Sequence, residues 1–167
     1  MNAAFSIRPA AIEDLPAITA IYNHAVLTTV ATFDTTPKTV EDQTPWFNAH
    51  GTDRHPIIVA ERDGEIAGWG ALSAWSDRCA YNDSAEISVY VAERFQGQGL
   101  GRALVEEVIR LGRKGGLHVL VSRIAEDNDV SVKLTESLGF THVGLLKEVG
   151  NKFGRRIGVI FMQYIYE

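Results

Sequence analysis

The sequence predicts an α/β fold in which a mixed central β-sheet carries about four helices on its faces. Two observations support this prediction: segments with helical periodicity alternate with short β-rich runs, and a glycine-rich turn joins one such run to an amphipathic helix. The predicted order is β-α-α-β-β-β-α-β-α-β-β. Because no repeat, low-complexity tract or long linker divides the 167 residues, we expect a single domain over 1–167.

The first part of the chain is expected to form a strand, two helices and a hairpin. Phe5 to Arg8 alternates as a short strand does, and the helices are expected over 12–26 and about 40–49. The apolar face of the first helix comprises Ile12, Leu15, Ile18, Ile21, Tyr22 and Ala25. Strands over 57–60 and 66–72 flank Asp63-Gly64, a strong hairpin signal.

The second part begins with a polar loop over 76–84 and a strand over 87–91. Leu100, Leu104, Val108 and Leu111 indicate an amphipathic helix that ends at Gly115-Gly116. The remaining elements are a strand over 119–124, a helix over about 130–138, and strands over 143–149 and 158–165 that flank a predicted loop over 150–156.

The composition excludes several classes of protein. Hydrophobic residues make up 46% and charged residues 22%, as in a globular domain. A net charge of −5 argues against nucleic-acid binding, and the absence of a long apolar run argues against a membrane protein. Cys79 is the only cysteine and Met1 to Ser6 do not resemble a signal peptide, so we expect a cytoplasmic location.

The most informative segment runs from Val89 to Arg102, a strand followed by a glycine-rich turn and a helix. Glycines allow the backbone to approach a ligand, and the N–H groups at a helix start can bind phosphate. The dinucleotide fingerprint fails, because its sixth position would be Arg102 or Leu104, and a P-loop fails because Arg102 follows Gly101. A tight turn that binds no ligand is the alternative.

The pattern that fits is Q/R-x-x-G-x-G/A, with Gln96, Gly99 and Gly101 at the fixed positions. In this the sequence resembles the GNAT superfamily of N-acetyltransferases, whose coenzyme A pyrophosphate loop has the same pattern. Asn128, Ser131 and the run over 134–140 resemble its second coenzyme A segment. Other segments resemble the branch that acetylates phosphinothricin and methionine sulfoximine: Ile21–Asn23, Trp46-Phe47, Ala85–Val91 and Val149–Arg155.

The resemblance implies that acetyl-CoA is the co-substrate and that its acetyl group passes directly to an amine in a ternary complex. It also implies a splayed strand pair in the sheet and a homodimer. The residues implied to contact the cofactor are Val89, Tyr90, Val91, Gln96, Gly97, Gln98, Gly99, Leu100, Gly101, Arg102, Asn128 and Ser131.

The acceptor amine must lose a proton, and Glu86 matches the glutamate that the family provides as a base. The acceptor is expected to be a small amino-acid-like molecule bound by Arg78, Tyr81, Glu86 and Ser88. Arg78 suits a carboxylate because its guanidinium can bind both oxygens. Glu86 as an ordinary surface glutamate, and Arg78 as a solvated loop arginine, are the alternatives.

Three positions depart from the branch. Thr135 stands where tyrosine or histidine is usual as the catalytic acid, Ile87 where histidine is frequent, and Gly158 where aspartate is common. A hydroxyl is a weak acid, so Thr135 either orients a water or the sulfur, or the acid lies elsewhere. A thiolate can also leave without full protonation, since the pKa of a free thiol is about 8.5.

Two other functions stay open at this point. A peptide or protein N-terminal acetyltransferase would share the cofactor loop, and a catalytically weak acyl-CoA-binding sensor would keep the loop while losing the acid. The five histidines are scattered, without an i, i+4 pair and without a cysteine cluster, so we expect no metal site.

Overall fold

The computed structural model describes residues 5–167, so the first four residues of the segment that we compared with a signal peptide lie outside it. Within the described residues the order of strands and α-helices agrees with the prediction. The strands are β1 (Ser6–Pro9), β2 (Ile57–Arg62), β3 (Glu65–Ala74), β4 (Ser84–Val91), β5 (Val119–Ala125), β6 (Thr141–Lys152) and β7 (Arg155–Ile165). The helices are α1 (Leu15–Thr28), α2 (Val40–Asn48), α3 (Leu100–Lys114) and α4 (Asp129–Ser137).

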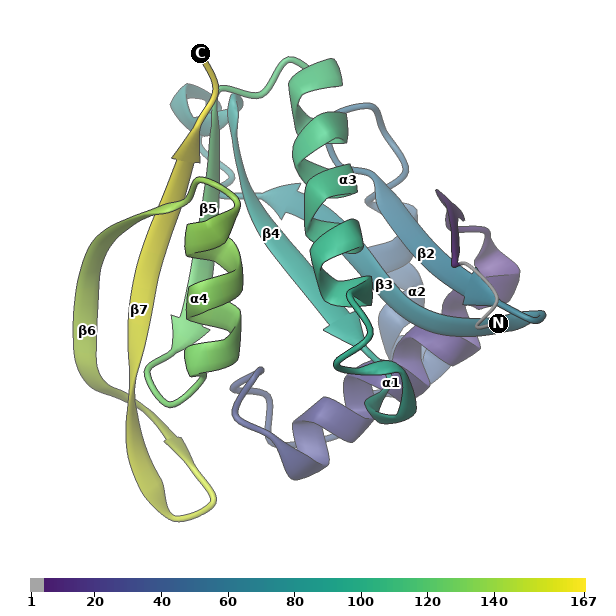
Figure 1. The fold of residues 1–167 in the computed structure, drawn as a ribbon, viewed down its shortest axis with the longest axis horizontal. Coiled ribbons are helices and arrows are strands. Elements are labelled where there is room, and N and C mark those ends of the chain that lie inside the picture. The colour runs from purple at the N-terminus through teal and green to yellow at the C-terminus, as the bar shows by residue number, and fades with distance from the viewer. Residues whose placement is uncertain (1–4) are drawn as a thin grey trace.

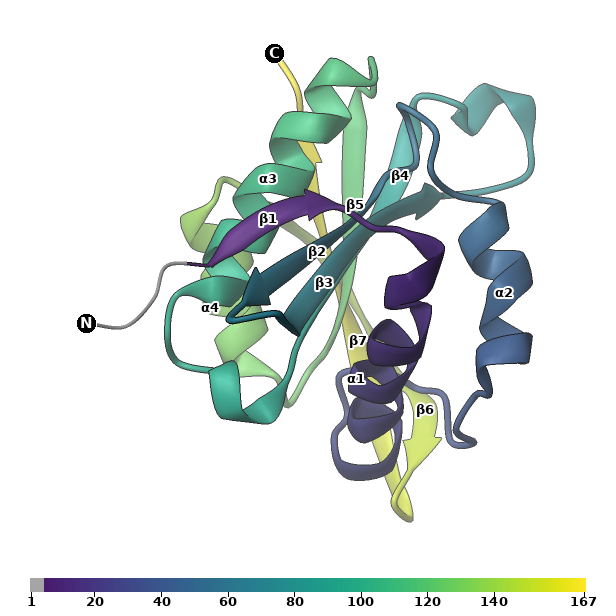
Figure 2. The ribbon, with the colours of Figure 1, turned by 90° about the vertical axis from the view of Figure 1, so that its right-hand side faces the viewer.

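The strands of residues 5–167 form one mixed sheet in the order β1-β2-β3-β4-β5-β7-β6. Its pairs are antiparallel except for β4 and β5, which run parallel. Helices α1 and α2 cover one face, and α3 and α4 cover the other (Figure 1, Figure 2). The predicted mixed sheet with helices on both faces is therefore confirmed.

The centre of the sheet opens between its two parallel strands. β4 and β5 pair over three residues only, from Ser84↔Val119 to Glu86↔Val121. Beyond Glu86 the strands diverge, as Figure 1 shows, although β4 continues to Val91 and β5 to Ala125. The backbone groups that face this opening have no neighbouring strand, so they are available to a ligand.

Each face of the sheet has its own hydrophobic core. Under α3, the residues Leu100, Leu104 and Val108 are almost completely buried, at the spacing of one helix face. They pack against Ile87 and Leu120 of the sheet. On the other face, α1 and α2 pack over a smaller cluster that includes Leu15, Ile18, Val59 and Trp69. Because neighbouring residues of a strand alternate between faces, Glu86, Ser88 and Tyr90 lie on the α1 side.

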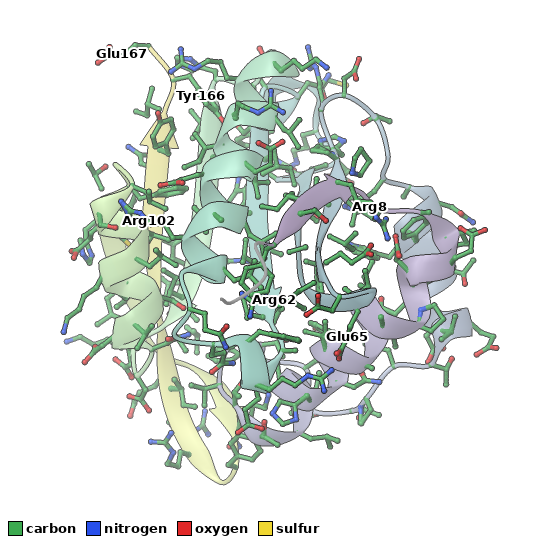
Figure 3. The ribbon with its side chains drawn as sticks, turned by 45° about the vertical axis from the view of Figure 1, so that its right-hand side comes forward. Arg8, Arg62, Glu65, Arg102, Tyr166 and Glu167 are labelled. Carbon is green, nitrogen blue, oxygen red and sulfur yellow. The ribbon has the colours of Figure 1, made fainter. Side chains whose placement is uncertain are left out.

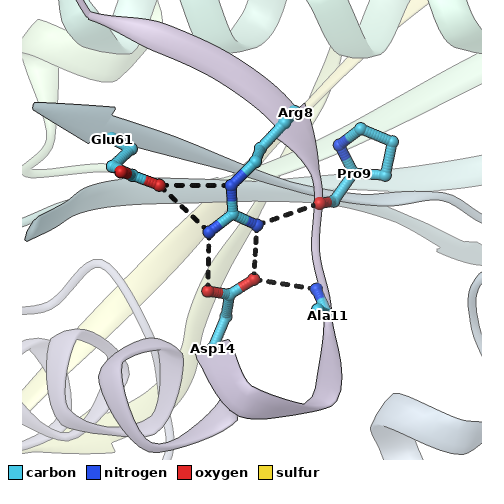
Figure 4. A network of polar contacts seen from close by, with 5 residues as sticks. All are labelled: Arg8, Pro9, Ala11, Asp14 and Glu61. Atoms are coloured by element: carbon cyan, nitrogen blue, oxygen red, sulfur yellow. Dashed lines mark hydrogen bonds and ion pairs between the residues drawn. The ribbon is translucent and has the colours of Figure 1, made fainter. Parts of the chain in front are cut away.

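Helix α1 begins later than the sequence predicted. Residues Ile12–Asp14 form a 3-10 turn, so Ile12 lies outside the helix and is 47% exposed. Asp14 ends that turn in an ion-pair network (Figure 4). Its carboxylate accepts two hydrogen bonds from Arg8, at 2.7 and 2.9 Å, and Arg8 also pairs with Glu61. The Arg8 guanidinium lowers the pKa of Asp14, and the network joins β1, β2 and the start of α1.

The predicted loop over 150–156 was wrong, because β6 and β7 continue into it. Only Phe153 and Gly154 form the turn, and both have positive φ, 52° and 72°, as a two-residue hairpin requires. The hairpin packs against the loop that follows α1. The Lys152 ammonium donates to the Thr32 carbonyl at 2.6 Å, and a side chain at Gly150 would collide with the Phe33 ring. This packing holds the loop over 29–34 beside the opening in the sheet.

Candidate active site

A cleft of about 1300 Å³ occupies the opening between β4 and β5. It reaches from the loop after α1 across β4 to the start of α4. The cleft is lined by most of the residues that the sequence suggested, namely Glu86, Ser88, Val89, Tyr90, Val91, Gln96, Gly97, Gly101, Asn128, Ser131 and Thr135. The predicted cofactor and base positions therefore lie in one cavity although they span 50 residues of the chain.

The glycine-rich turn lies at one wall of this cleft. Gly97 and Gly99 have φ of 70° and 82°, in the left-handed region that favours glycine. A Cβ on either residue would meet no protein atom within 4 Å, so the space beside the turn is open. Gly99 caps the start of α3, and the Gln96 amide donates to the Val91 carbonyl at 3.2 Å. Unpartnered N–H groups at a helix start beside open space suit the phosphates of a nucleotide cofactor.

Three other residues of the predicted loop contact protein with their side chains. Leu100 is buried in the core under α3, so only its backbone could serve a cofactor. Gln98 accepts a hydrogen bond from Arg62 at 2.7 Å. Arg102, which Figure 3 labels, donates to Ser137 of α4 at 3.0 Å and pairs with Glu106. These three side chains do not line the cleft, and the same holds for Gly99.

On the opposite wall, Asn128 caps α4 by accepting a hydrogen bond from the Ser131 N–H at 3.2 Å. The start of this second helix thus faces the same cleft as the start of α3. Arg155 of the β6–β7 hairpin lies nearby and pairs with Asp127 at 2.9 Å. The cleft therefore lies between two helix starts and an ion pair.

Glu86 lies at the point where β4 and β5 separate, and its carboxylate is paired. The Arg123 guanidinium donates from Nε to Oε1 and from Nη2 to Oε2, each at 2.6 Å. Arg123 reaches Glu86 because Val121 stands beside Glu86 in the sheet, and the next residue on that face of β5 is Arg123. Arg123 was not among the site residues predicted from the sequence. No spacing signal points to it, because the register between strands 37 residues apart is not encoded locally.

Thr135 is buried in the wall of the cleft, and its hydroxyl already has partners. Oγ1 donates toward the Ser131 carbonyl at 2.9 Å, one helical turn earlier, and lies 3.1 Å from the sulfur of Met162. A threonine that bonds back to its own helix has its proton directed away from the cavity. The position at which the resemblance implies an acid is thus occupied here by a hydroxyl that is hydrogen-bonded to its own helix.

The other two departures from the branch also have structural accounts. Ile87 is buried in the core under α3. At Gly158 a Cβ would lie 2.8 Å from the Leu146 carbonyl oxygen and 2.9 Å from the carboxyl group of Glu126. Glu126 itself accepts a hydrogen bond from the Gly158 N–H at 2.7 Å. An aspartate does not fit at this position unless both the backbone at Leu146 and the Glu126 side chain move.

The loop before β4 carries Arg78 and Tyr81, which the sequence suggested for the acceptor. Both flank or belong to a short 3-10 turn, and neither lines the cleft. Tyr81 is 44% exposed. The structure therefore brings Glu86 and Ser88 to the cavity but leaves Arg78 and Tyr81 outside it.

A histidine that was not predicted from the sequence lies behind the wall of the cleft, where it contacts Ser73. His50 Nδ1 lies 2.6 Å from the Trp46 carbonyl, so it carries the proton, and Nε2 is left to accept from the Ser73 hydroxyl at 2.8 Å. Ser73 lines the cleft and stands directly opposite Glu86 in the sheet. Burial lowers the pKa of His50, which favours the neutral ring.

The described residues, 5–167, lack a metal-binding cluster and a membrane-spanning helix. No group of three or more His, Cys, Asp or Glu side chains in this range is arranged to hold a metal ion. None of the helices in the same range is both long enough and apolar enough to cross a membrane.

The comparison with protein families decides the classification of the chain. The model of the Acetyltransferase (GNAT) family matches residues 18–140, which contain the cleft-forming strands, the glycine turn and α4. The chain belongs to this GNAT family. The fold and the resemblance inferred from Gln96, Gly99 and Gly101 are thereby confirmed, and the protein is an N-acetyltransferase by family.

Two relatives show which branch this GNAT chain resembles. The L-methionine sulfoximine/L-methionine sulfone acetyltransferase of Pseudomonas paraeruginosa is 40% identical over 159 residues, covering 95% of this chain and 92% of the relative. The phosphinothricin N-acetyltransferase of Streptomyces coelicolor is 38% identical over 157 residues and covers 92% of each. The branch predicted from the sequence is confirmed.

Solved structures agree with this placement. yncA from Salmonella typhimurium, with its cofactor acetyl-CoA, superposes with a TM-score of 0.94 at 37% identity, covering 98% of this chain and 95% of that one. A ribosomal-protein-alanine N-acetyltransferase from Brucella melitensis superposes with a TM-score of 0.93 at 40% identity, covering 96% and 99%. The GNAT fold therefore extends over nearly the whole chain.

Proposed function

We propose that this GNAT protein transfers the acetyl group of acetyl-CoA directly to the primary amine of a small amino-acid-like acceptor, of the methionine sulfone or phosphinothricin type. The observation that carries the proposal is the position of Glu86. It lies in the same cleft as the glycine turn, at the point where β4 and β5 separate. A carboxylate there can act on an amine placed at the inner end of the cofactor.

The cleft fits the cofactor. The open space beside Gly97 and Gly99 and the start of α3 would receive the pyrophosphate. The backbone of Val89 to Val91, which has no strand on its β5 side, would bind the pantetheine arm, with Asn128 and Ser131 on the other wall. Acetyl-CoA would supply the acetyl group as a thioester. The matching relatives named as acetyltransferases support this assignment.

Glu86 is proposed as the base. An ammonium group has no lone pair for attack, so the acceptor amine has to lose a proton, either directly to a carboxylate oxygen or through a water. The half-buried Glu86 lies on the wall of the cleft, next to Ser88 on the same face of β4. Ser88 would then hydrogen-bond the acceptor beside the reacting nitrogen.

An assay of thiol release from acetyl-CoA tests this function. The panel should contain L-methionine sulfone, L-methionine sulfoximine, phosphinothricin, common amino acids, polyamines and short peptides. We expect release to depend on an amino-acid acceptor and the N-acetyl product to appear by mass spectrometry. If no amine in the panel gives thiol release, the proposal is contradicted.

The base has its own test. Glu86→Gln keeps the size of the side chain but removes its proton affinity, so turnover at saturating substrate should fall by about 10²–10⁴-fold. Affinity for acetyl-CoA, measured by calorimetry, should stay unchanged. A variant that turns over within a few-fold of the wild type would show that Glu86 is not the base.

A second candidate function is acetylation of the N-terminus of a protein. The structural neighbour from Brucella melitensis, named for ribosomal-protein alanine, favours it. The peptides in the panel separate the two functions, since a protein acetyltransferase would use an alanine-initiated peptide better than any free amino acid.

The oligomeric state, the cellular location and the domain boundaries are proposed as well. We propose a homodimer, because the exposed edge strand β6 presents Val143, Leu145, Leu146 and Val149 to solvent. A cytoplasmic location is proposed from the free, exposed thiol of Cys79. One N-acetyltransferase domain over 1–167 is proposed from the continuous sheet that the described residues form.

A further inference from the structure

The pair between Glu86 and Arg123 has a geometry that bears on the proposed chemistry. Both carboxylate oxygens of Glu86 accept hydrogen bonds from the guanidinium at 2.6 Å. A carboxylate has about four lone-pair positions, and a base contacts the N–H that it deprotonates through one of them. The guanidinium occupies one position on each oxygen of Glu86, so release of either hydrogen bond opens a further position to an amine.

Arg123 is the more exposed partner, with 53% of its side chain accessible against 21% for Glu86. A guanidinium has five N–H groups, and two are used in this pair. Within residues 5–167 the other three have no protein acceptor. The guanidinium also lies 5.9 Å from the centre of the Trp75 ring, which in turn packs edge-on against Phe161. Arg123 thus lines the cleft beside the Trp75 ring, and three of its N–H groups are available to a ligand.

The other cations at the cleft have different partners. Among the described residues only Arg123 and Arg155 line it as arginine or lysine, and Arg155 pairs with Asp127 on the β6–β7 side. Lys152 is buried and donates to the Thr32 carbonyl. Arg78 lies outside the cleft. Of the arginine and lysine side chains that line the cleft, Arg123 is therefore the one that contacts the proposed base.

We propose that Arg123 binds the α-carboxylate of the amino-acid acceptor, and that this binding frees Glu86 to act on the amine of the same molecule. This inference rests on the proposed function. A carboxylate offers the guanidinium the same two-oxygen partner that Glu86 offers, so Arg123 stays paired, and the ammonium of the acceptor takes its place beside Glu86. In an α-amino acid the amine and carboxylate share one carbon, so the amine arrives beside the released Glu86.

The exchange makes the carboxylate of the acceptor promote activity. An amine without a carboxylate leaves Arg123 on Glu86, with one lone-pair position of each oxygen still occupied. The structure therefore assigns a selectivity filter to Arg123, which discriminates between an amino acid and its amide although both carry the same amine and side chain.

The test compares two acceptor pairs, L-methionine sulfone with its α-carboxamide and L-leucine with L-leucinamide. Steady-state kinetics are measured for the wild type, Arg123→Gln and Arg123→Lys. Arg110→Gln, which removes an exposed arginine that pairs with Glu107 on α3, serves as the matched control. Thermal unfolding and acetyl-CoA titration verify that each variant is folded and binds the cofactor.

We expect Arg123→Gln to lower kcat/KM for the acids by about 10–100-fold, mainly through KM, as hydrogen bonds between charged groups imply. The amides should change little or react faster, because Glu86 is no longer paired. Arg123→Lys should recover part of the loss, since it keeps the charge without the fork. The quantity to compare between variant and wild type is the ratio of kcat/KM for the acid to kcat/KM for the amide. This ratio is needed because the amines of the acid and the amide differ in basicity.

Other outcomes overturn the inference. If Arg123→Gln lowers kcat equally for acids and amides, Arg123 only positions Glu86. If Arg78→Gln produces the acid-selective loss and Arg123→Gln does not, the carboxylate binds at the loop before β4. Wild-type protein that uses amides as well as acids overturns the filter but leaves the proposed function intact. Failure with the whole amine panel overturns both.

Discussion

At the scale of single residues, hydrogen bonds determine what each side chain of the cleft can do. Glu86 and Thr135 were found from the family motif, and both line the cleft. Their hydrogen bonds to Arg123 and to the Ser131 carbonyl depend on strand register and rotamer. Neither is visible in a local pattern. Ser73 and His50 were missed for the same reason, since 23 residues separate them along the chain.

The contacts of Thr135 lead to a prediction. Because its hydroxyl donates to the Ser131 carbonyl, Thr135→Val should leave the single-turnover rate within about threefold of the wild type and cost about 1 kcal/mol of stability, as one neutral hydrogen bond does. Rapid-quench acetyl transfer across pH checks this. A large rate loss with an unchanged free energy of unfolding would mean that the Thr135 hydroxyl turns toward the thioester sulfur of the cofactor during the reaction.

His50 gives a prediction about pH. Burial holds the pKa of His50 below its ordinary value of 6.5, so the folded state disfavours its protonated form. Its contribution to stability is complete above pH 6.5 and is lost as the pH falls from there through the lower pKa of the folded state. Urea unfolding at pH 7.5 and 5.5 should show a smaller loss for His50→Gln than for the wild type.

The matched control for this pH test is His118→Gln, which removes an exposed histidine. It should lose as much stability between the two pH values as the wild type does. Equal losses in all three proteins would remove His50 from the pH response.

At the scale of elements, the helices were easier to predict than the strands. Helix α3 was expected from Leu100 to Gly115-Gly116 and spans Leu100–Lys114, because its apolar spacing and its terminal glycines agree. The strands over 141–152 and 155–165 were expected to be shorter. Their turn is built on Phe153, a residue that rarely adopts positive φ, so no turn signal marked its position.

The turn before α3 carries a prediction at this scale. Gly99→Val places a β-branched residue at φ 82°, which strains the backbone by about 1–3 kcal/mol and inserts a side chain into the open space beside the turn. We expect acetyl-CoA affinity to fall at least tenfold, a free-energy loss of about 1.4 kcal/mol. Calorimetric titration measures it.

The control for Gly99→Val is Gly116→Val, at the other end of α3. Gly116 has φ of 75° and equally open surroundings, so the two variants share the strain, but only Gly99 belongs to the turn whose neighbours Gly97 and Gly101 line the cleft. Loss of stability in both with loss of cofactor affinity only in Gly99→Val would assign the turn to the cofactor. Equal affinities would exclude it.

At the scale of the whole molecule, the sheet ends at β6, and nine consecutive residues from Thr141 to Val149 are exposed. Leu145 and Leu146 pair with Ile160 and Val159 of β7, while the other edge of the strand has no neighbour within the described residues. The sequence could not reveal this edge, because the strand order, unlike the element order, depends on long-range pairing.

This edge predicts a homodimer. Light scattering after size exclusion should give twice the mass of the chain for the wild type, and Leu146→Lys should shift the population toward the monomer, because a lysine resists burial between two copies. The exposed Val130 of α4 offers a control, since Val130→Lys alters an apolar residue away from β6. A monomeric wild type would contradict the proposal.

The divergence of β4 and β5 has a consequence for the lifetime of the protein. Along this opening the free chain exposes to water a row of backbone groups that a bound pantetheine arm would cover, so the ligand completes the sheet as a missing strand would. A ligand that binds only the folded state adds about 2.7 kcal/mol of stability at a hundred times its dissociation constant. Resistance to unfolding, and with it turnover by proteases, would then follow the acetyl-CoA supply of the cell, so that the enzyme persists when its co-substrate is abundant.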